Sequence, residues 1–282
     1  MIGFILTVLG TSAEEVGIAF GKKNVQSKKI GTYGLMVLHT FVSIAIFLAT
    51  VLIWPGTFVF SVLSLPFFLA RAFFEVLQMY MSTQALVRSD RTTFSFVRTL
   101  TIPLLLAVDV FLGYSLSFFQ IAGIAILTLA ILAIFSGKQF SKVGIGYVLF
   151  SAINAVITIS LFKYNIAHFN SIAAEQLGIL SILALYAMIG RYVTNEPSPF
   201  RLVVSERPIF WQVLSESIGG VLQSFAFLFL PPSILIAVKR STSVFLSLVS
   251  GHYVFHEKHV LWKGTTVTML IVSLILLVMG AQ

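Results

Sequence analysis

Acidic residues inside long apolar stretches are the groups in this sequence best suited to chemistry. Glu14 and Glu15 stand next to each other in such a stretch. A charged side chain at mid-membrane costs roughly 2.5–3.5 kcal/mol on insertion scales, so it must face a protein interior or a hydrated cavity. Two adjacent carboxylates in a low-dielectric environment also repel each other, which favours a proton on one of them. Glu14 or Glu15 is therefore our candidate for a proton-binding group, unless Lys or Arg side chains neutralise both acids.

Glycines place Glu14 at an expected helix contact. Gly3, Gly10, Glu14 and Gly17 fall on one narrow face of a helix drawn through this stretch. Because glycines allow close approach, we expect another helix backbone to pack against this face. Asn154 stands at the corresponding place in the second half of the chain, where Glu15 stands in the first.

Polar stripes at helical spacing indicate further residues of a cavity. Arg71, Glu75 and Gln78 recur at i, i+4 and i+7, and Gln212, Glu216 and Gln223 also share a face. We expect Glu216 to lie opposite Arg71 near the middle of the membrane, where carrier sites are found. The alternative is that Arg71 and Glu75 form an i,i+4 ion pair that serves stability alone.

All the predicted site residues are assigned to substrate binding. We predict no catalytic group, cofactor or metal. The set is Glu14, Glu15, Arg71, Glu75, Gln78, Asn154, Glu175, Glu216, Gln223 and Lys239. Lys239 is included because a cation there would neutralise a carboxylate or phosphate on a substrate. His252, His256 and His259 have the spacing of a zinc site, but their charged surroundings favour a solvated loop.

The elements that position these residues are long apolar helices. The chain has 282 residues, of which 58% are hydrophobic and only 10% are charged. Soluble proteins carry about 25% charge, so this chain lacks the polar surface of a soluble domain. The absence of cysteine from the sequence excludes disulfides and thiolate metal sites.

Ten stretches have the length of about 20 residues that a membrane-spanning helix needs. They predict an all-α membrane protein with ten transmembrane helices. The predicted spans are Ile2–Phe20, Tyr33–Trp54, Phe58–Met81, Thr93–Phe111, Ser117–Phe135, Val143–Phe162, Phe169–Ile189, Ile209–Leu230, Pro232–Val254 and Leu261–Met279.

The net charge of +8 reflects membrane topology rather than nucleic-acid binding. Thirteen Lys and Arg fall in one alternate set of connections, and one, Lys163, falls in the other. The basic face is expected to be cytoplasmic, which predicts a multi-pass protein of the cell membrane with both termini outside.

The chain divides near residue 138 into two halves of five spans, and an odd number of spans gives the halves opposite orientations. Val76-Leu77-Gln78 is repeated as Val221-Leu222-Gln223, and Ser12-Ala13 as Ser151-Ala152. We therefore predict two inverted repeats, residues 1–137 and residues 138–282.

The two repeats have similar ends. The first end is Leu112-Gly113-Tyr114-Ser115-Leu116-Ser117 followed by Gly123, and the second is Phe255-His256-Glu257 followed by Gly264. These ends resemble those of the EamA-like branch of the drug/metabolite transporter superfamily. Pro103 matches a proline that is common in the fourth helix of the family. Residues 11–15 depart from the usual pattern of the first helix, and family members more often have cytoplasmic termini. The resemblance implies ten spans in two repeats and export of metabolites; in small multidrug exporters, which are distant relatives, a first-helix Glu binds protons.

Three hypotheses follow for function. The first is a secondary transporter that exports a small polar or amphipathic metabolite by alternating access, with possible proton coupling. The second is a membrane-embedded enzyme, which would need polar groups clustered near one interface. The third is a non-transporting scaffold, which would not need so many buried charges. The expected partners of the first are the metabolite and the lipid bilayer, with no nucleic acid; the sequence leaves the oligomeric state open.

Overall fold

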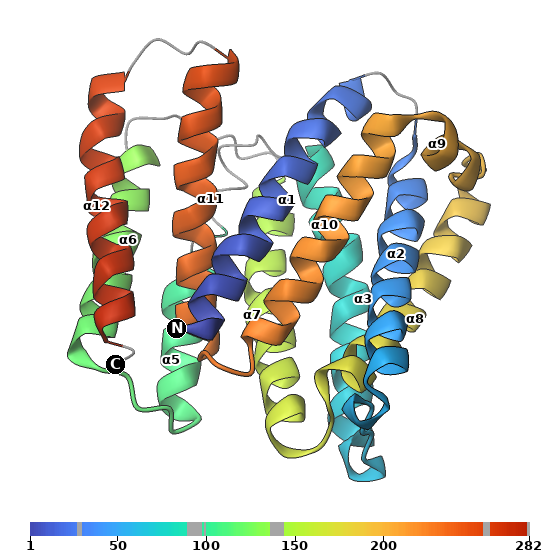
Figure 1. Ribbon diagram of the computed structural model, residues 1–282, viewed down its shortest axis with the longest axis horizontal. Helices are drawn as coiled ribbons and strands as arrows, with labels where there is room; N and C mark the ends of the chain where they lie inside the picture. The colour runs from blue at the N-terminus through green and yellow to red at the C-terminus, as the bar shows by residue number, and fades with distance from the viewer. Residues whose placement is uncertain (27–29, 89–97, 99, 136–143, 256–259, 281–282) are drawn as a thin grey trace. The chain divides into compact units, whose positions relative to one another are not determined.

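The computed structural model of the protein is helical, and the residues that it describes contain no β-strand. It describes residues 1–282 apart from 27–29, 89–97, 99, 136–143, 256–259 and 281–282 (Figure 1). The predicted all-α class is thus confirmed. The helices are α1 (Ile2–Gln26), α2 (Thr32–Ile53), α3 (Leu65–Arg88), α5 (Thr101–Phe111), α6 (Phe118–Phe135), α7 (Ile145–His168), α8 (Ile172–Val193), α9 (Phe200–Ser205), α10 (Arg207–Ala226), α11 (Pro232–Phe255) and α12 (Val260–Met279).

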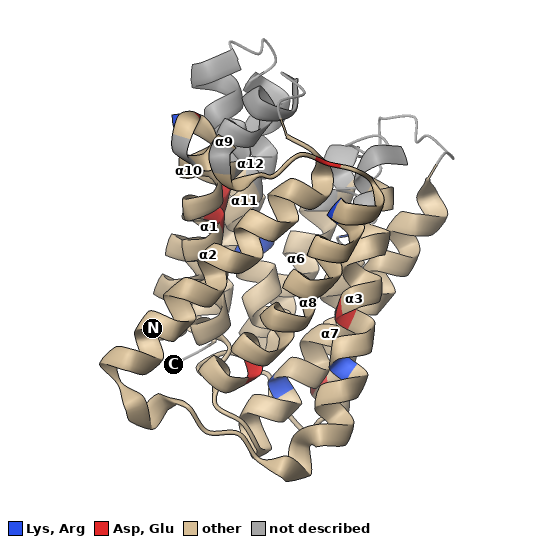
Figure 2. Cartoon of the chain, turned by 90° about the vertical axis from the view of Figure 1, so that its right-hand side faces the viewer, with Lys and Arg blue, Asp and Glu red and all other residues tan. Residues whose placement is uncertain are grey.

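Four stretches of the described chain are long and apolar enough to cross a membrane. They are Thr32–Ile53, Pro55–Ser82, Ile145–His168 and Ile172–Val193. They correspond to the second, third, sixth and seventh predicted spans and indicate a membrane protein. Figure 2 shows that few of the residues coloured on the helices are Lys, Arg, Asp or Glu. The total of ten spans remains a prediction.

The chain folds as two compact units, and each unit draws on both halves of the sequence. Unit 1 comprises Met1–Val8, Tyr80–Ser160 and Phe229–Gln282, whereas unit 2 comprises Leu9–Met79 and Leu161–Leu228. Helices α1, α3 and α7 therefore contribute to both units. The predicted repeats divide the chain differently, because a sequence repeat need not coincide with a compact body.

Unit 1 is organised around two helix pairs, α6 with α12 and α5 with α11. The α6–α12 contact is close at Gly123, where an added Cβ would lie 3.0 Å from the Ser273 carbonyl oxygen. Asp109 of α5 is fully buried, and its Oδ2 accepts a hydrogen bond of 2.7 Å from the backbone N–H of Ser233. Ser233 lies in the first turn of α11, so Asp109 caps that helix from a neighbouring element.

Unit 2 is held by the packing of α2 against both α8 and α10. Leu38 of α2 is buried with Ile209 and Val213 of α10. Phe68 of α3 is buried with Ile179 of α8. These contacts bring together the helices that carry most of the predicted site residues.

Candidate functional site

Most of the predicted site residues belong to unit 2. Eight of the ten lie there, on α1, α3, α8 and α10, while Asn154 of α7 and Lys239 of α11 lie in unit 1. Asn154 is buried and Lys239 is half-buried. Within unit 2 the charged members form two groups, one around Arg71 and one around Glu14 and Glu216.

Arg71 is the centre of a buried ion-pair network. Its side chain forms ion pairs with Glu175 at 3.0 Å, between Nη1 and Oε1, and with Glu75 at 3.5 Å, between Nη2 and Oε1. The i,i+4 ion pair between Arg71 and Glu75, which the structural alternative for this stripe expects, is present. The pair with Glu175 was not predicted, because the two residues are 104 positions apart. The expected partner, Glu216, is not among the ion pairs that the described residues give Arg71.

Glu175 is fixed in place by several donors. Its Oε1 accepts 2.8 Å from Asn165 Nδ2, in addition to the Arg71 guanidinium, and its Oε2 accepts 2.6 Å from Asn170 Nδ2. Glu175 also lies in the first turn of α8, where the helix dipole favours negative charge. Glu175 is fully buried and so heavily hydrogen-bonded that we interpret it as the permanent counter-ion of Arg71.

Glu75 differs from Glu175 in exposure and in the strength of its contact. Its side chain is 21% exposed and lies at the longer distance from Arg71. One guanidinium faces two carboxylates in this network, so the ionised group carries one surplus negative charge. Glu75 is therefore the more accessible of the two acids in this network.

The Arg71 network extends to α10 through Gln176. Arg71 Nη2 donates to Gln176 Oε1 at 3.2 Å, and Gln176 Nε2 donates to Ser224 Oγ at 2.7 Å. The Phe162 ring lies over the guanidinium, with its centroid 4.3 Å from Arg71 Cζ. Sequence reasoning missed Asn165, Gln176 and Ser224, although polar residues inside apolar spans were the signal by which Glu175 was found.

The second group arises where α1 crosses α10. A Cβ added to Gly219 would lie 2.6 Å from Glu14 Cγ, and a Cβ added to Gly17 would lie 2.6 Å from Glu216 Cγ. Glu14 thus packs against Gly219, three residues after Glu216. In the same way, Glu216 packs against Gly17, three residues after Glu14. The two helices present the same pattern, Glu-x-x-Gly, to each other in antiparallel directions. The close contact predicted for the glycine face of the first span is confirmed, with α10 as the partner.

His39 and Gln212 complete this second group. Gln212 Nε2 donates to Glu216 Oε1 at 3.3 Å, and Ser217 Oγ donates to the carbonyl oxygen of His39 at 3.2 Å. His39 lies within electrostatic reach of Glu14 and of the Glu216 backbone, and Glu14 and Glu216 lie within electrostatic reach of each other. The crossing therefore brings two like charges and one imidazole together. We refer to Glu14 and Glu216 as the glutamate pair, and His39 is the histidine beside it.

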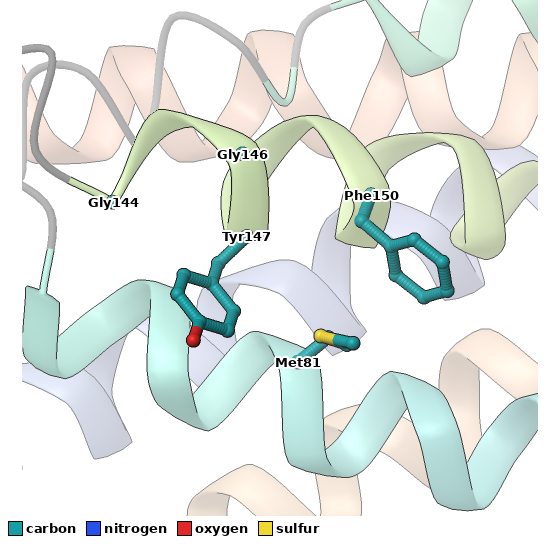
Figure 3. Close-up of a pocket in the computed structure, with 5 residues that line it drawn as sticks. All are labelled: Met81, Gly144, Gly146, Tyr147 and Phe150. Carbon is teal, nitrogen blue, oxygen red and sulfur yellow. The ribbon is translucent and has the colours of Figure 1, made fainter.

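A pocket in unit 1 has a different character. It has a volume of about 390 Å³ and is lined by Met81, Gly144, Gly146, Tyr147 and Phe150. Figure 3 shows Tyr147 extending from α7 toward the helix that carries Met81. None of the predicted site residues lines this pocket, and its lining is almost wholly apolar.

The histidines weighed as a zinc site lie largely beyond the described residues. His256 and His259 are outside them, and the side chain of His252 is not described. Within the described part of the chain, no three His, Asp or Glu side chains are placed to hold a metal ion.

The comparisons with known proteins bear on the fold. No family model matches the chain, and no curated protein matches it. Among solved structures, 28 chains match. One of these, a protein known by its crystal structure, matches 98% of this chain and 95% of its own length, with a TM-score of 0.67 and 16% identity. At that identity the match shows that the chain shares a fold with an experimentally solved protein.

Proposed function

We propose that this protein is a secondary transporter that exports a small polar or amphipathic metabolite across the cell membrane by alternating access, coupled to protons. The observation that carries the proposal is the gathering of ionisable side chains inside the apolar helices of unit 2, around Arg71 and at the α1–α10 crossing. Intramembrane ionisable residues are costly, and they mark substrate and proton pathways. The membrane-embedded enzyme and the scaffold gain no specific support from these groups.

The packing within each unit supports the proposed inverted repeats. If residues 1–137 and 138–282 are repeats, α2 corresponds to α8, α5 to α11 and α6 to α12. Each of these pairs packs together within one unit. The contact of α2 with α10 likewise has its counterpart in the contact of α8 with α3. Pairing of equivalent helices is what a pseudo-twofold axis in the membrane plane produces. Ten spans and membership of the EamA-like family remain part of the proposal.

Each group of unit 2 has a distinct role in this proposal. The glutamate pair is assigned the proton-binding role, because both acids lie at the α1–α10 crossing. The Arg71–Glu175 pair is a rigid frame. Glu75, Gln78 and Gln223 bind substrate, and Lys239 and Asn154 of unit 1 are assigned the same role from the sequence. Of the two acids first considered for proton binding, Glu14 is preferred over Glu15 because it lies in the crossing.

Proteoliposome transport with and without a pH gradient tests the function. A panel of radiolabelled metabolites is applied to wild-type protein, Glu14→Gln and Glu15→Gln. We expect gradient-driven transport by the wild type and by Glu15→Gln, and its loss in Glu14→Gln. Transport by Glu14→Gln at the wild-type rate would refute the proton role, and wild-type vesicles that move nothing across the panel would favour an enzyme or scaffold.

A further inference from the structure

The connector between α2 and α3 is an exposed segment without charge. Residues 54–64 contain two short 3₁₀ turns, Pro55–Thr57 and Val62–Ser64, joined by extended chain. Large apolar side chains are strongly exposed along it, including Trp54 at 61%, Val62 at 72% and Leu63 at 77%. The whole stretch from residue 30 to residue 70 contains no Asp, Glu, Lys or Arg. In Figure 1 the connector lies at the lower end of α2 and α3.

Several backbone groups of this connector have protein partners. Thr57 N–H donates to the Trp54 carbonyl at 2.9 Å, and Ser64 N–H donates to the Ser61 carbonyl at 3.0 Å. Val59 N–H donates to Ser171 Oγ at 3.0 Å, and the Val59 carbonyl accepts 2.8 Å from Ser171 N–H. Asn170 Oδ1 accepts 2.9 Å from Ser61 N–H. The middle of the connector, at Val59 and Ser61, is thereby hydrogen-bonded to the α7–α8 connection of the same unit.

These two properties together decide where the connector is most stable. Irregular chain is normally kept out of lipid because its unpaired N–H and C=O groups lose their water partners. Here many of those groups have protein partners, so that cost is reduced while the apolar side chains still favour leaving water. A tryptophan at the end of a spanning helix also has the position preferred by aromatic residues at the membrane–water interface.

The other connection of α8 gives the opposite pattern. Residues 194–199, between α8 and α9, read Thr-Asn-Glu-Pro-Ser-Pro and are mostly polar. Glu196 accepts a hydrogen bond of 2.8 Å from Gly34 N–H at the start of α2. This connection is therefore attached to α2 through a carboxylate. The α2–α3 connector therefore differs from the α8–α9 connection in its lack of charge, a property that it shares with the short connection Phe169-Asn170-Ser171 to which it is hydrogen-bonded.

We propose that the α2–α3 connector is immersed in the interfacial region of the lipid bilayer, with Trp54 at the level of the headgroups and Val62 and Leu63 against the upper acyl chains. The binding partner is the lipid itself. This inference requires that the protein spans a membrane, but it does not depend on transport, on a substrate or on protons.

Depth-dependent tryptophan quenching tests this proposal. The sequence has three tryptophans, so Trp211→Phe with Trp262→Phe leaves Trp54 alone. This variant is reconstituted into phosphatidylcholine vesicles that contain lipids brominated at shallow or deep acyl positions, and acrylamide is used as the aqueous quencher. The matched control carries Ser198→Trp on the polar connection, with all three native tryptophans changed to Phe. Circular dichroism and gel filtration establish that both variants are folded.

The expected result is a blue-shifted Trp54 emission, stronger quenching by shallow than by deep bromines, and acrylamide quenching at least threefold weaker than in the control. Equal acrylamide quenching of the two tryptophans would place the connector in water and overturn the proposal. Protection of Trp54 from both acrylamide and brominated lipids would mean that protein covers the connector, which would overturn it as well.

Discussion

The two units put their buried charges to different uses. Five of the six acids predicted inside spans lie in unit 2, and only Asp109 lies in unit 1. Asp109 is committed to the first turn of α11 and is fully buried. In unit 2, by contrast, two acids face one guanidinium, and two further acids meet at a helix crossing. Asp109 binds the start of α11, whereas the acids of unit 2 lie around Arg71 and at the α1–α10 crossing, where the proposed function assigns them to ligand or proton binding.

The largest expected effect would come from the glutamate pair. If Glu14 and Glu216 share one proton, Glu14→Gln and Glu216→Gln should each abolish gradient-driven transport, with at least a tenfold loss. The double variant should then be no worse than either single variant, because sites that act as one unit are not additive. Uptake into proteoliposomes measures this. Losses that multiply in the double variant would show that the two acids act independently.

The ion-pair network should give the largest loss of stability. Arg71→Met leaves Glu175 buried without its counter-ion, which is expected to lower the free energy of unfolding by about 3–5 kcal/mol. Glu75→Gln is the matched control. It removes only the longer and partly exposed contact, so about 1 kcal/mol or less is expected. Denaturant unfolding in mild detergent measures both values. Equal losses would mean that Glu75 and Glu175 are equivalent partners of Arg71.

The helix crossing itself is tested by two adjacent glycines. In Gly219→Ala the new methyl group would meet the Gly10 carbonyl oxygen at 2.6 Å, whereas at Gly220 no atom lies within 4 Å. We expect Gly219→Ala to cost about 1–3 kcal/mol through overpacking. The control Gly220→Ala should be neutral or stabilising by up to about 1 kcal/mol, because alanine has the higher helix propensity. Thermal unfolding of both variants would show no difference if α1 and α10 were loosely packed.

The smallest effect is expected in unit 1. Asp109→Ala removes the acceptor at the start of α11 and should destabilise the protein by about 0.5–2 kcal/mol, whereas Asp109→Asn keeps an acceptor oxygen and should cost less. Both variants should retain gradient-driven transport in proteoliposomes. A loss of transport in a stably folded Asp109→Asn variant would contradict the view that the buried acid of unit 1 serves stability while those of unit 2 serve transport.

The sequence was sufficient to predict the local features of this molecule. Long apolar runs gave the all-α class, and the predicted span Tyr33–Trp54 agrees closely with α2, Thr32–Ile53. The predicted span Phe58–Met81 lies within the stretch Pro55–Ser82 that is long and apolar enough to cross a membrane, but the α-helix α3 begins only at Leu65. Pro66 explains this boundary, since proline is well tolerated in the first turn of a helix and restricts the residue before it.

The contacts between distant elements were beyond the sequence pattern. The Arg71–Glu75 pair follows from helical spacing, but the Arg71–Glu175 pair depends on how α3 packs against α8. The glycine face showed that a helix would contact Glu14, yet periodicity within α1 carries no information about which helix that is. The matching Glu-x-x-Gly pattern at 216–219 was the available signal, and it became meaningful only when α10 was found against α1.

The reciprocal crossing of α1 and α10 constrains how this protein can evolve. Each glutamate side chain occupies the volume that a missing Cβ leaves on the opposite helix. A larger residue at position 219 would meet the Gly10 carbonyl oxygen as well as the Glu14 side chain, and one at position 17 would meet the Gln212 carbonyl oxygen as well as Glu216. Related chains that keep this crossing should therefore keep glycine at both positions, even where the acid opposite it changes.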